Sequence, residues 1–149
     1  MDLIALAPGN LDEAARLHGI AMADGLGGQA WSAETFQTLL ATPGTFGWML
    51  AGQGLILVRH TDSEAEIFTI GVVPAARRQG AARTLLETAC LALAALKAER
   101  LLLEVAVDNI PAQRFYQQAG FAITGRRRGY YKRGTARIDA LVMELALAG

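Results

Sequence analysis

The segment at residues 77–82 reads RRQGAA and stands where an apolar run gives way to a helical pattern. The first turn of a helix leaves backbone N–H groups without intrahelical partners, and the helix dipole adds partial positive charge there. Gly80 lets a ligand approach the backbone closely, and the two alanines after it keep the turn free of bulk. These features predict a site for an anion such as a pyrophosphate. Its residues are Arg77, Arg78, Gln79, Gly80, Ala81, Ala82 and Arg83.

Two other phosphate-binding loops are excluded by the sequence. It contains neither a GxxxxGK motif followed by Ser or Thr nor a GxGxxG motif, which the nucleotide folds that use these loops require. The remaining alternative is a helix whose start merely happens to be basic. Arginines at a helix start oppose the dipole, so the anion site is the favoured interpretation.

Glu104 is the candidate for acid–base chemistry, because it is the one carboxylate in the apolar run LLLEVAV at residues 101–107. A carboxylate held in apolar surroundings accepts a proton more readily than one in water. We therefore predict a general base at Glu104. The alternative is a glutamate near a strand end that pairs with an arginine.

The hydrophobic pattern predicts the elements that position these residues. Strands are expected at 3–7, 45–51, 54–60, 64–73, 101–107, 121–125 and 137–147, and residues 126–136 are expected to form a basic turn region. Helices are expected after Asn10, from Ser32 to residue 40, at 79–97 and from Asn109 to Gly120. The order β-α-α-β-β-β-α-β-α-β-β predicts an α/β (α+β) fold with a mixed sheet, mostly antiparallel around one parallel β-α-β unit.

Composition limits the function classes. The 149 residues are 52% hydrophobic and carry zero formal net charge, which suits one domain over 1–149 and argues against broad capture of nucleic acid. Cys90 is the only cysteine, so no internal disulfide or CxxC metal site is expected. His18 and His60 are too few and too far apart in sequence for a histidine metal centre. An acidic N-terminus and the lack of an 18-residue apolar run lead us to expect a cytoplasmic protein without a membrane span.

Two blocks carry a family resemblance. The stretch ARRQGAA resembles the R/Q-x-x-G-x-G/A acetyl-CoA signature of the GCN5-related N-acetyltransferases, with Arg77, Gly80 and Ala82 at the defining positions. The stretch DNIPAQRFYQQAGF is similar to a second block of that superfamily, NxxAxxxYxxxGF, through Asn109, Ala112, Tyr116, Gly120 and Phe121. Within the superfamily the chain most resembles the RimI-type ribosomal-protein-alanine N-acetyltransferases, from Trp31 to the final strand.

This resemblance implies a fold and a co-substrate. The fold is a central sheet of about seven strands flanked by four helices, with the fourth and fifth strands splayed apart to admit acetyl-CoA. The pantetheine arm pairs with backbone groups of Ile70, Gly71 and Val72, much as an added strand does. The diphosphate sits on the amides of residues 78–83, and Asn109 and Ala112 complete the co-substrate site. No metal is implied.

The resemblance also implies chemical roles. Acetyl passes directly to an amine, with Tyr116 as proton donor to the leaving thiolate, and Glu66 is the rival of Glu104 as base. Trp31, the GLGG loop before it, Tyr131 and Asp139 are expected on the acceptor side, with Glu66. Four alternatives stay open: Tyr116 as a core aromatic, Asn109 as only a helix cap, Asp139 paired with an arginine, and the basic segment as a solvated turn or, less favoured, a nucleic-acid contact.

The acceptor is expected to be the N-terminal α-amine of a protein or peptide, with ribosomal proteins among the candidates. An α-amine of pKa about 8 is roughly one-tenth neutral at pH 7, whereas a lysine of pKa about 10.4 is neutral in less than about one part in a thousand. One carboxylate base therefore suits the α-amine better. The alternatives are acetylation of a small amine or a lysine, or a catalytically silent domain that binds acyl-CoA.

Overall fold

The computed structural model describes residues 2–25 and 28–147. The helices are α1 Leu11–Ala21, α2 Ala33–Leu40, α3 Ala81–Ala95 and α4 Ile110–Gln118, with short 3-10 turns at Pro8–Asn10 and Pro74–Ala76. The strands are β1 Leu3–Ala5, β2 Thr45–Leu50, β3 Gly54–Thr61, β4 Glu64–Val72, β5 Arg100–Ala106, β6 Ala122–Arg133 and β7 Ala136–Ala146. The expected order of helices and strands is confirmed.

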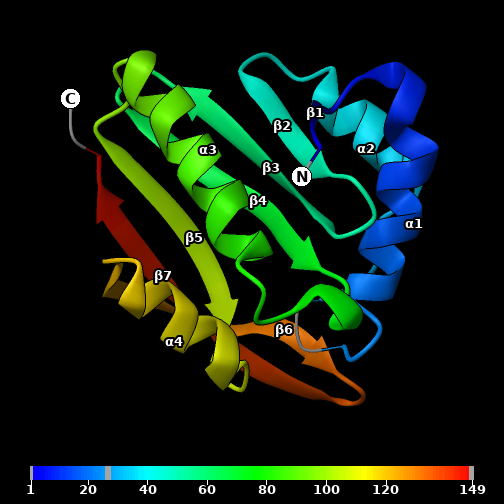
Figure 1. Ribbon diagram of the computed structural model, residues 1–149. Helices are drawn as coiled ribbons and strands as arrows, with labels where there is room; N and C mark the ends of the chain where they lie inside the picture. Colours follow the sequence, from blue (N-terminus) through cyan, green and yellow to red (C-terminus); the bar gives the residue numbers. More distant parts are fainter. Residues whose placement is uncertain (1, 26–27, 148–149) are drawn as a thin grey trace.

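One seven-stranded sheet has the order β1-β2-β3-β4-β5-β7-β6 (Figure 1). Every neighbouring pair is antiparallel except β4 and β5, which are parallel and are joined through α3. The mixed, mostly antiparallel sheet follows from the short β2-β3-β4 connections and the single helical crossover.

The two central strands separate soon after they meet. Only Glu64–Glu66 of β4 pairs with residues of β5, in register with Arg100 to Leu102. Beyond these residues the strands diverge, and a V-shaped gap opens towards their carboxyl ends (Figure 1). The expected splay between the fourth and fifth strands is confirmed.

Apolar side chains form two cores on opposite faces of the sheet. One is built on α3, with Leu85 and Leu93 buried against β3, β4 and β5. The other lies under α1 and α2, where Leu17 and Phe36 pack onto β2 and β3. Among the described residues, no helix is long and apolar enough to cross a membrane.

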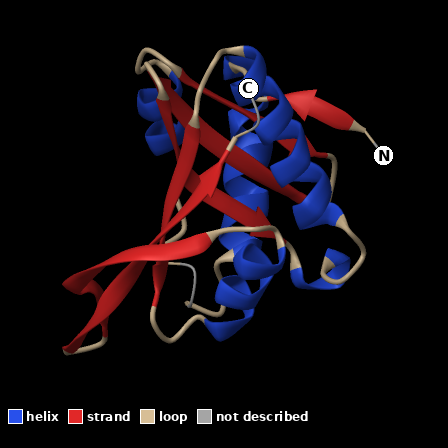
Figure 2. Cartoon of the chain, turned by 90° about the vertical axis from the view of Figure 1, so that its left-hand side faces the viewer, coloured by secondary structure: helices blue, strands red, loops and turns tan. Residues whose placement is uncertain are grey.

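Two of the differences from the predicted boundaries bear on the site. The basic segment is not a turn region, because residues 126–133 belong to β6 and pair with β7 through a register shift between Arg127 and Tyr131. The far ends of β6 and β7 project as a two-stranded ribbon (Figure 2). Helix α3 begins at Ala81 rather than Gln79, since Arg78 and Gly80 have φ of 63° and 85°, which a right-handed helix excludes.

Candidate functional site

The N-terminus of α3 has the geometry predicted for an anion site. The first helical hydrogen bond runs from the Thr84 N–H to the Gly80 carbonyl, so the N–H groups of Ala81, Ala82 and Arg83 precede it. Gly80 is required by its left-handed φ of 85°, not by crowding, because a Cβ there would meet nothing within 4 Å. The space beside this glycine is open.

The Arg77 guanidinium is engaged with α1 and β4, although the sequence predicted Arg77 as part of the anion site. Its Nε donates to the Val72 carbonyl at 3.1 Å, and its Nη2 donates to the Ala21 carbonyl at 3.0 Å. Its Nη1 lies 3.5 Å from the Asp24 carboxylate. The guanidinium therefore joins the end of β4 to the end of α1. Arg83 is exposed and lies 4.0 Å from Glu87.

The segment Ile70 to Val72 forms the β4 side of the gap. These residues pair with β3 on one edge, and the β5 register has already ended at Glu66. Close packing also requires a glycine at position 71, because a Cβ on Gly71 would lie 2.9 Å from both the Ala21 Cβ and the Met22 Cε. The end of α1 thus rests directly on this part of β4.

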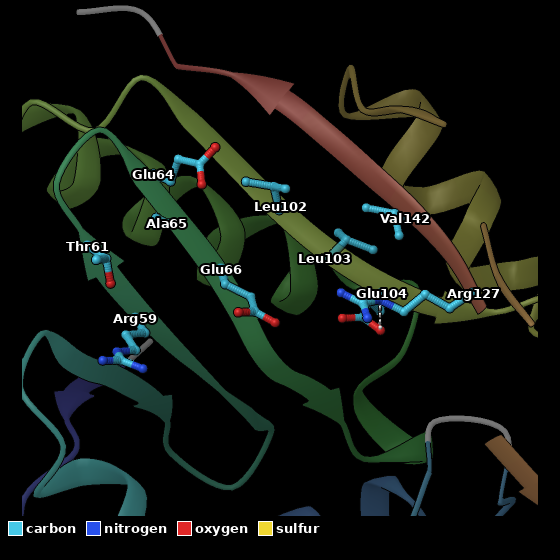
Figure 3. A pocket seen from close by; sticks show the side chains of 10 residues that line it. All are labelled: Arg59, Thr61, Glu64, Ala65, Glu66, Leu102, Leu103, Glu104, Arg127 and Val142. Carbon is cyan, nitrogen blue, oxygen red and sulfur yellow. Dashed lines mark ion pairs between the residues drawn. The ribbon is translucent and has the colours of Figure 1, made fainter. Parts of the chain in front are cut away.

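Glu66 and Glu104 meet where β4 and β5 part. Figure 3 shows both carboxylates on one face of the sheet, in a cavity of about 210 Å³ that Arg59 and Arg127 also line. Burial raises the pKa of Glu66, and the Glu104 charge raises it further, whereas Arg127 and Arg59 act to lower it. Glu66, with its raised pKa, can accept a proton at this place, and the two arginines moderate that rise.

Glu104 is paired with an arginine, which was the predicted alternative to a role as general base. Arg127 Nε lies 3.2 Å from Glu104 Oε2, with 17% of the Glu104 side chain and 58% of the Arg127 side chain exposed. Glu104 Oε2 is buried and has no hydrogen-bond partner among the described residues, so the contact is electrostatic rather than an aligned hydrogen bond. Sequence reasoning missed Arg127, one of several arginines in its segment.

The tyrosines of β6 lie beside Glu104. The Tyr131 hydroxyl donates to the Glu104 carbonyl oxygen at 3.4 Å, and burial together with the Glu104 charge raises the pKa of Tyr131 to about 12. The Tyr130 ring is 5.6 Å from the Arg127 guanidinium. Tyr131 therefore lies beside the main chain of Glu104.

Tyr116 lies on α4 inside the larger core. Its ring is 5.4 Å from those of Phe115 and Phe121, and only 7% of the residue is exposed. Burial first and the neighbouring Tyr131 second raise its pKa above the usual value. The packing matches the core-aromatic alternative, and the raised pKa makes this phenol a weaker proton donor than an exposed tyrosine.

Asn109 and Asp139 both have structural tasks. Asn109 accepts a hydrogen bond from the Ala112 N–H at 3.3 Å and caps α4. Asp139 accepts from the Gly129 N–H at 2.9 Å and from Arg126 Nε at 2.5 Å. The hydrogen bond from Gly129 lowers the pKa of Asp139 most, and the bond from Arg126 lowers it further. The carboxylate stabilises the β6 register shift, so the arginine-pairing alternative is observed.

Trp31 packs inward, against α1 and α2. Its ring stacks on His18 at 5.0 Å between centroids and meets Phe36 edge-on at 5.3 Å. His18 was considered in the sequence only as a metal ligand, and among the residues described no group of three or more metal-binding side chains occurs. Leu26 and Gly27 of the GLGG loop lie outside the described residues.

Comparison with known proteins decides the family. The model of the acetyltransferase (GNAT) family matches residues 27–121. The chain belongs to this family. A protein of Mycobacterium tuberculosis named N-alpha-acetyltransferase RimI is 34% identical over 115 residues, which are 72% of this chain and 71% of that protein.

Other relatives agree in sequence and shape. The ribosomal protein bS18-alanine N-acetyltransferase of Escherichia coli is 38% identical over 85 residues. This match covers 57% of each protein, so the chain spans little more than half the length of that relative. The crystal structure of the Escherichia coli ribosomal-protein-S18-alanine N-acetyltransferase has a TM-score of 0.85 and 28% identity, covering 99% of this chain and 94% of that one.

Proposed function

We propose that this GNAT protein transfers acetyl from acetyl-CoA to the N-terminal α-amine of a protein or peptide. One observation carries the proposal: the gap between β4 and β5 has an amide-rich helix start at its open end and two carboxylates where it closes. A phosphate-bearing thioester fits the open end, and an amine that must lose a proton fits the closed end.

Acetyl-CoA is held mainly by main-chain groups. Its diphosphate accepts hydrogen bonds from the amides at the start of α3, with Arg78 and Arg83 nearby. Its pantetheine arm adds to the edge of β4 at residues 70–72, in the way that an extended peptide adds to a sheet. Asn109 and Ala112 border the same gap by fixing the start of α4.

The acceptor nitrogen needs a proton acceptor before it can attack. Glu104 or Glu66, directly or through a water, takes a proton from the ammonium, and the free amine attacks the thioester carbonyl. An N–C bond forms, the C–S bond breaks, and the thiolate leaves with the electron pair. Tyr116 gives that thiolate its proton, and the proton that the attacking nitrogen loses as the amide forms returns to the Tyr116 oxygen through water. Because the pKa of Tyr116 is raised and the thiol pKa is about 8.5, the transfer to the thiolate depends on close positioning.

The acceptor reaches the carboxylates on the face that carries α1 and α2. Tyr131 stands beside Glu104, and Trp31 belongs to the loop that borders this face. Asp139 acts indirectly, through the β6 register shift. The relatives named above act on a ribosomal protein or on α-amines, which supports an N-terminal acceptor, a ribosomal protein among the candidates. A cytoplasmic location is part of the same proposal.

A peptide panel tests this function. Purified protein is incubated with acetyl-CoA and peptides that have a free N-terminus, a blocked N-terminus with an internal lysine, or both ends blocked. Mass spectrometry should find acetyl only on free α-amines. Acetylation confined to lysine would overturn the acceptor assignment, and calorimetry without heat on mixing with CoA would overturn the co-substrate assignment.

Two variants separate catalysis from binding. Glu104→Gln and Tyr116→Phe should each lower kcat by about a hundredfold or more, the usual scale for a lost acid or base, while binding of CoA is retained. If wild-type protein binds CoA but acetylates no peptide or small amine, the protein is a silent acyl-CoA-binding domain instead.

A further inference from the structure

His18 is a buried polar residue that the acetyl-transfer chemistry does not use. It lies on α1 and is 1% exposed. Its Nδ1 accepts a hydrogen bond from the Trp31 main-chain N–H at 3.0 Å, and its Nε2 lies 2.9 Å from Thr69 Oγ1. Phe36 meets the imidazole edge-on with the ring centroids 5.4 Å apart. One imidazole therefore joins α1, the chain before α2, and β4.

The two hydrogen bonds define the tautomer. A backbone N–H can only donate, so Nδ1 carries no proton and the proton of a neutral imidazole is on Nε2. The Nε2–H then donates to the Thr69 hydroxyl. Burial lowers the pKa of His18 to about 4, which keeps the ring neutral near pH 7. Both contacts are thus available together under physiological conditions.

The end of α1 is held against β4 at two further points. Arg77 donates to the Ala21 carbonyl at the end of α1. The missing side chain at Gly71 lets Ala21 and Met22 lie directly on β4. Because residues 69–72 border the acetyl-CoA gap and Trp31 borders the acceptor face, these contacts connect the two substrate sites.

We propose that His18 is a positioning residue that holds the main chain of Trp31 in place against β4, and thereby shapes the acceptor site. This rests on the proposed function, because it takes the Trp31 side as the acceptor side. Nδ1 is the essential atom, since it bonds Trp31 itself. Nε2–H anchors the ring on Thr69.

Two amide variants separate the two ring nitrogens. The Oδ1 of His18→Asn stands near the place of Nδ1 and can still accept from the Trp31 N–H. The terminal amide of His18→Gln stands near Nε2 and can still donate to Thr69, but it leaves Trp31 without an acceptor. Both variants bury an amide in place of the imidazole. If His18 had only a structural role, the two substitutions would therefore alter the protein to a similar extent. His60→Gln is the matched control, because His60 is half-buried on β3 and its ring bonds the nearby Asp62 carbonyl.

Steady-state kinetics with the best peptide of the panel is the first measurement. We expect His18→Gln to raise the peptide KM about tenfold, the effect of one lost hydrogen bond, with the KM for acetyl-CoA unchanged. His18→Asn should stay within about threefold of wild type, and His60→Gln should match wild type. An equal rise of the peptide KM in His18→Asn and His18→Gln would overturn the proposal. A parallel loss of acetyl-CoA affinity would also overturn it.

A second readout does not depend on activity. In a Trp48→Phe background, Trp31 is the only tryptophan, and acrylamide quenching reports its accessibility. We expect stronger quenching in His18→Gln than in His18→Asn. Equal quenching of both variants would overturn the positioning role even if no acceptor peptide is found, whereas wild-type inactivity on every amine would overturn only the proposed function.

Discussion

Arg127 Nε stands 3.2 Å from Glu104 Oε2 at the point where β4 and β5 separate, and Glu66 shares the cavity with both. The guanidinium of Arg127 acts to lower the pKa of Glu66. It comes from β6, a strand that does not touch β4 in the sheet order. The pKa of Glu66 therefore depends on a residue from the far edge of the sheet.

Replacing Arg127 should move the pH profile. Arg127 acts to lower the pKa of Glu66, so Arg127→Gln raises that pKa. A carboxylate base works only when ionised, so if Glu66 is the base the acidic limb of kcat/KM should shift upward by about half a pH unit, a small effect because Arg127 is exposed. Arg128→Gln is the control. If the acidic limb of Arg127→Gln stays in place or moves downward, Arg127 does not lower the pKa of the base.

The identity of the base is decided by comparing two carboxylates. If Glu104 is the base, Glu104→Gln should reduce kcat by about a hundredfold or more, and Glu66→Gln should have a much smaller effect. Acetyl-CoA binding, followed by calorimetry, should be retained in both variants. The reverse order of effects would assign the base to Glu66. Similar losses would indicate that the pair acts as one unit.

Gly71→Ala and Gly80→Ala should act in different ways. At Gly71 the new methyl meets Ala21 and Met22 at 2.9 Å, so we expect a loss of about 1–3 kcal/mol of folding free energy. At Gly80 the space is open, but φ is 85°, so the cost is about 1 kcal/mol of backbone strain, with weaker CoA binding as the main effect. Thermal unfolding and CoA titration of both variants check this, and identical behaviour would contradict it.

Stability should depend on His18 below neutral pH. Its folded pKa of about 4 lies below the unfolded value of about 6.5, so the unfolded state binds the additional proton between those values. The stability present above pH 6.5 is lost as the pH falls towards 4, by about 2 kcal/mol between pH 7 and pH 5. Urea unfolding of wild type and His18→Asn at both pH values measures this. An equal pH dependence in the two proteins would exclude His18 as its source.

Local patterns in the sequence determined the elements. The proline and glycine positions and the alternation of apolar residues are short-range features, and they correctly predicted the element order and the parallel pair. The basic segment was the exception. Its arginines and glycine are typical of a turn, but pairing with β7 extends it into β6, and pairing with a distant strand overrides local preference.

Only the tertiary structure decided how the charged and buried polar groups combine. His18 and Thr69 are 51 residues apart, and Arg127 reaches Glu104 across β7, so neither contact leaves a periodic trace in the chain. Arg77 has the residue type expected at an anion site, but its guanidinium donates to carbonyls of α1 and β4. Side-chain partners of this kind depend on where long-range strand pairing and helix packing place each backbone, and one-dimensional spacing does not carry that information.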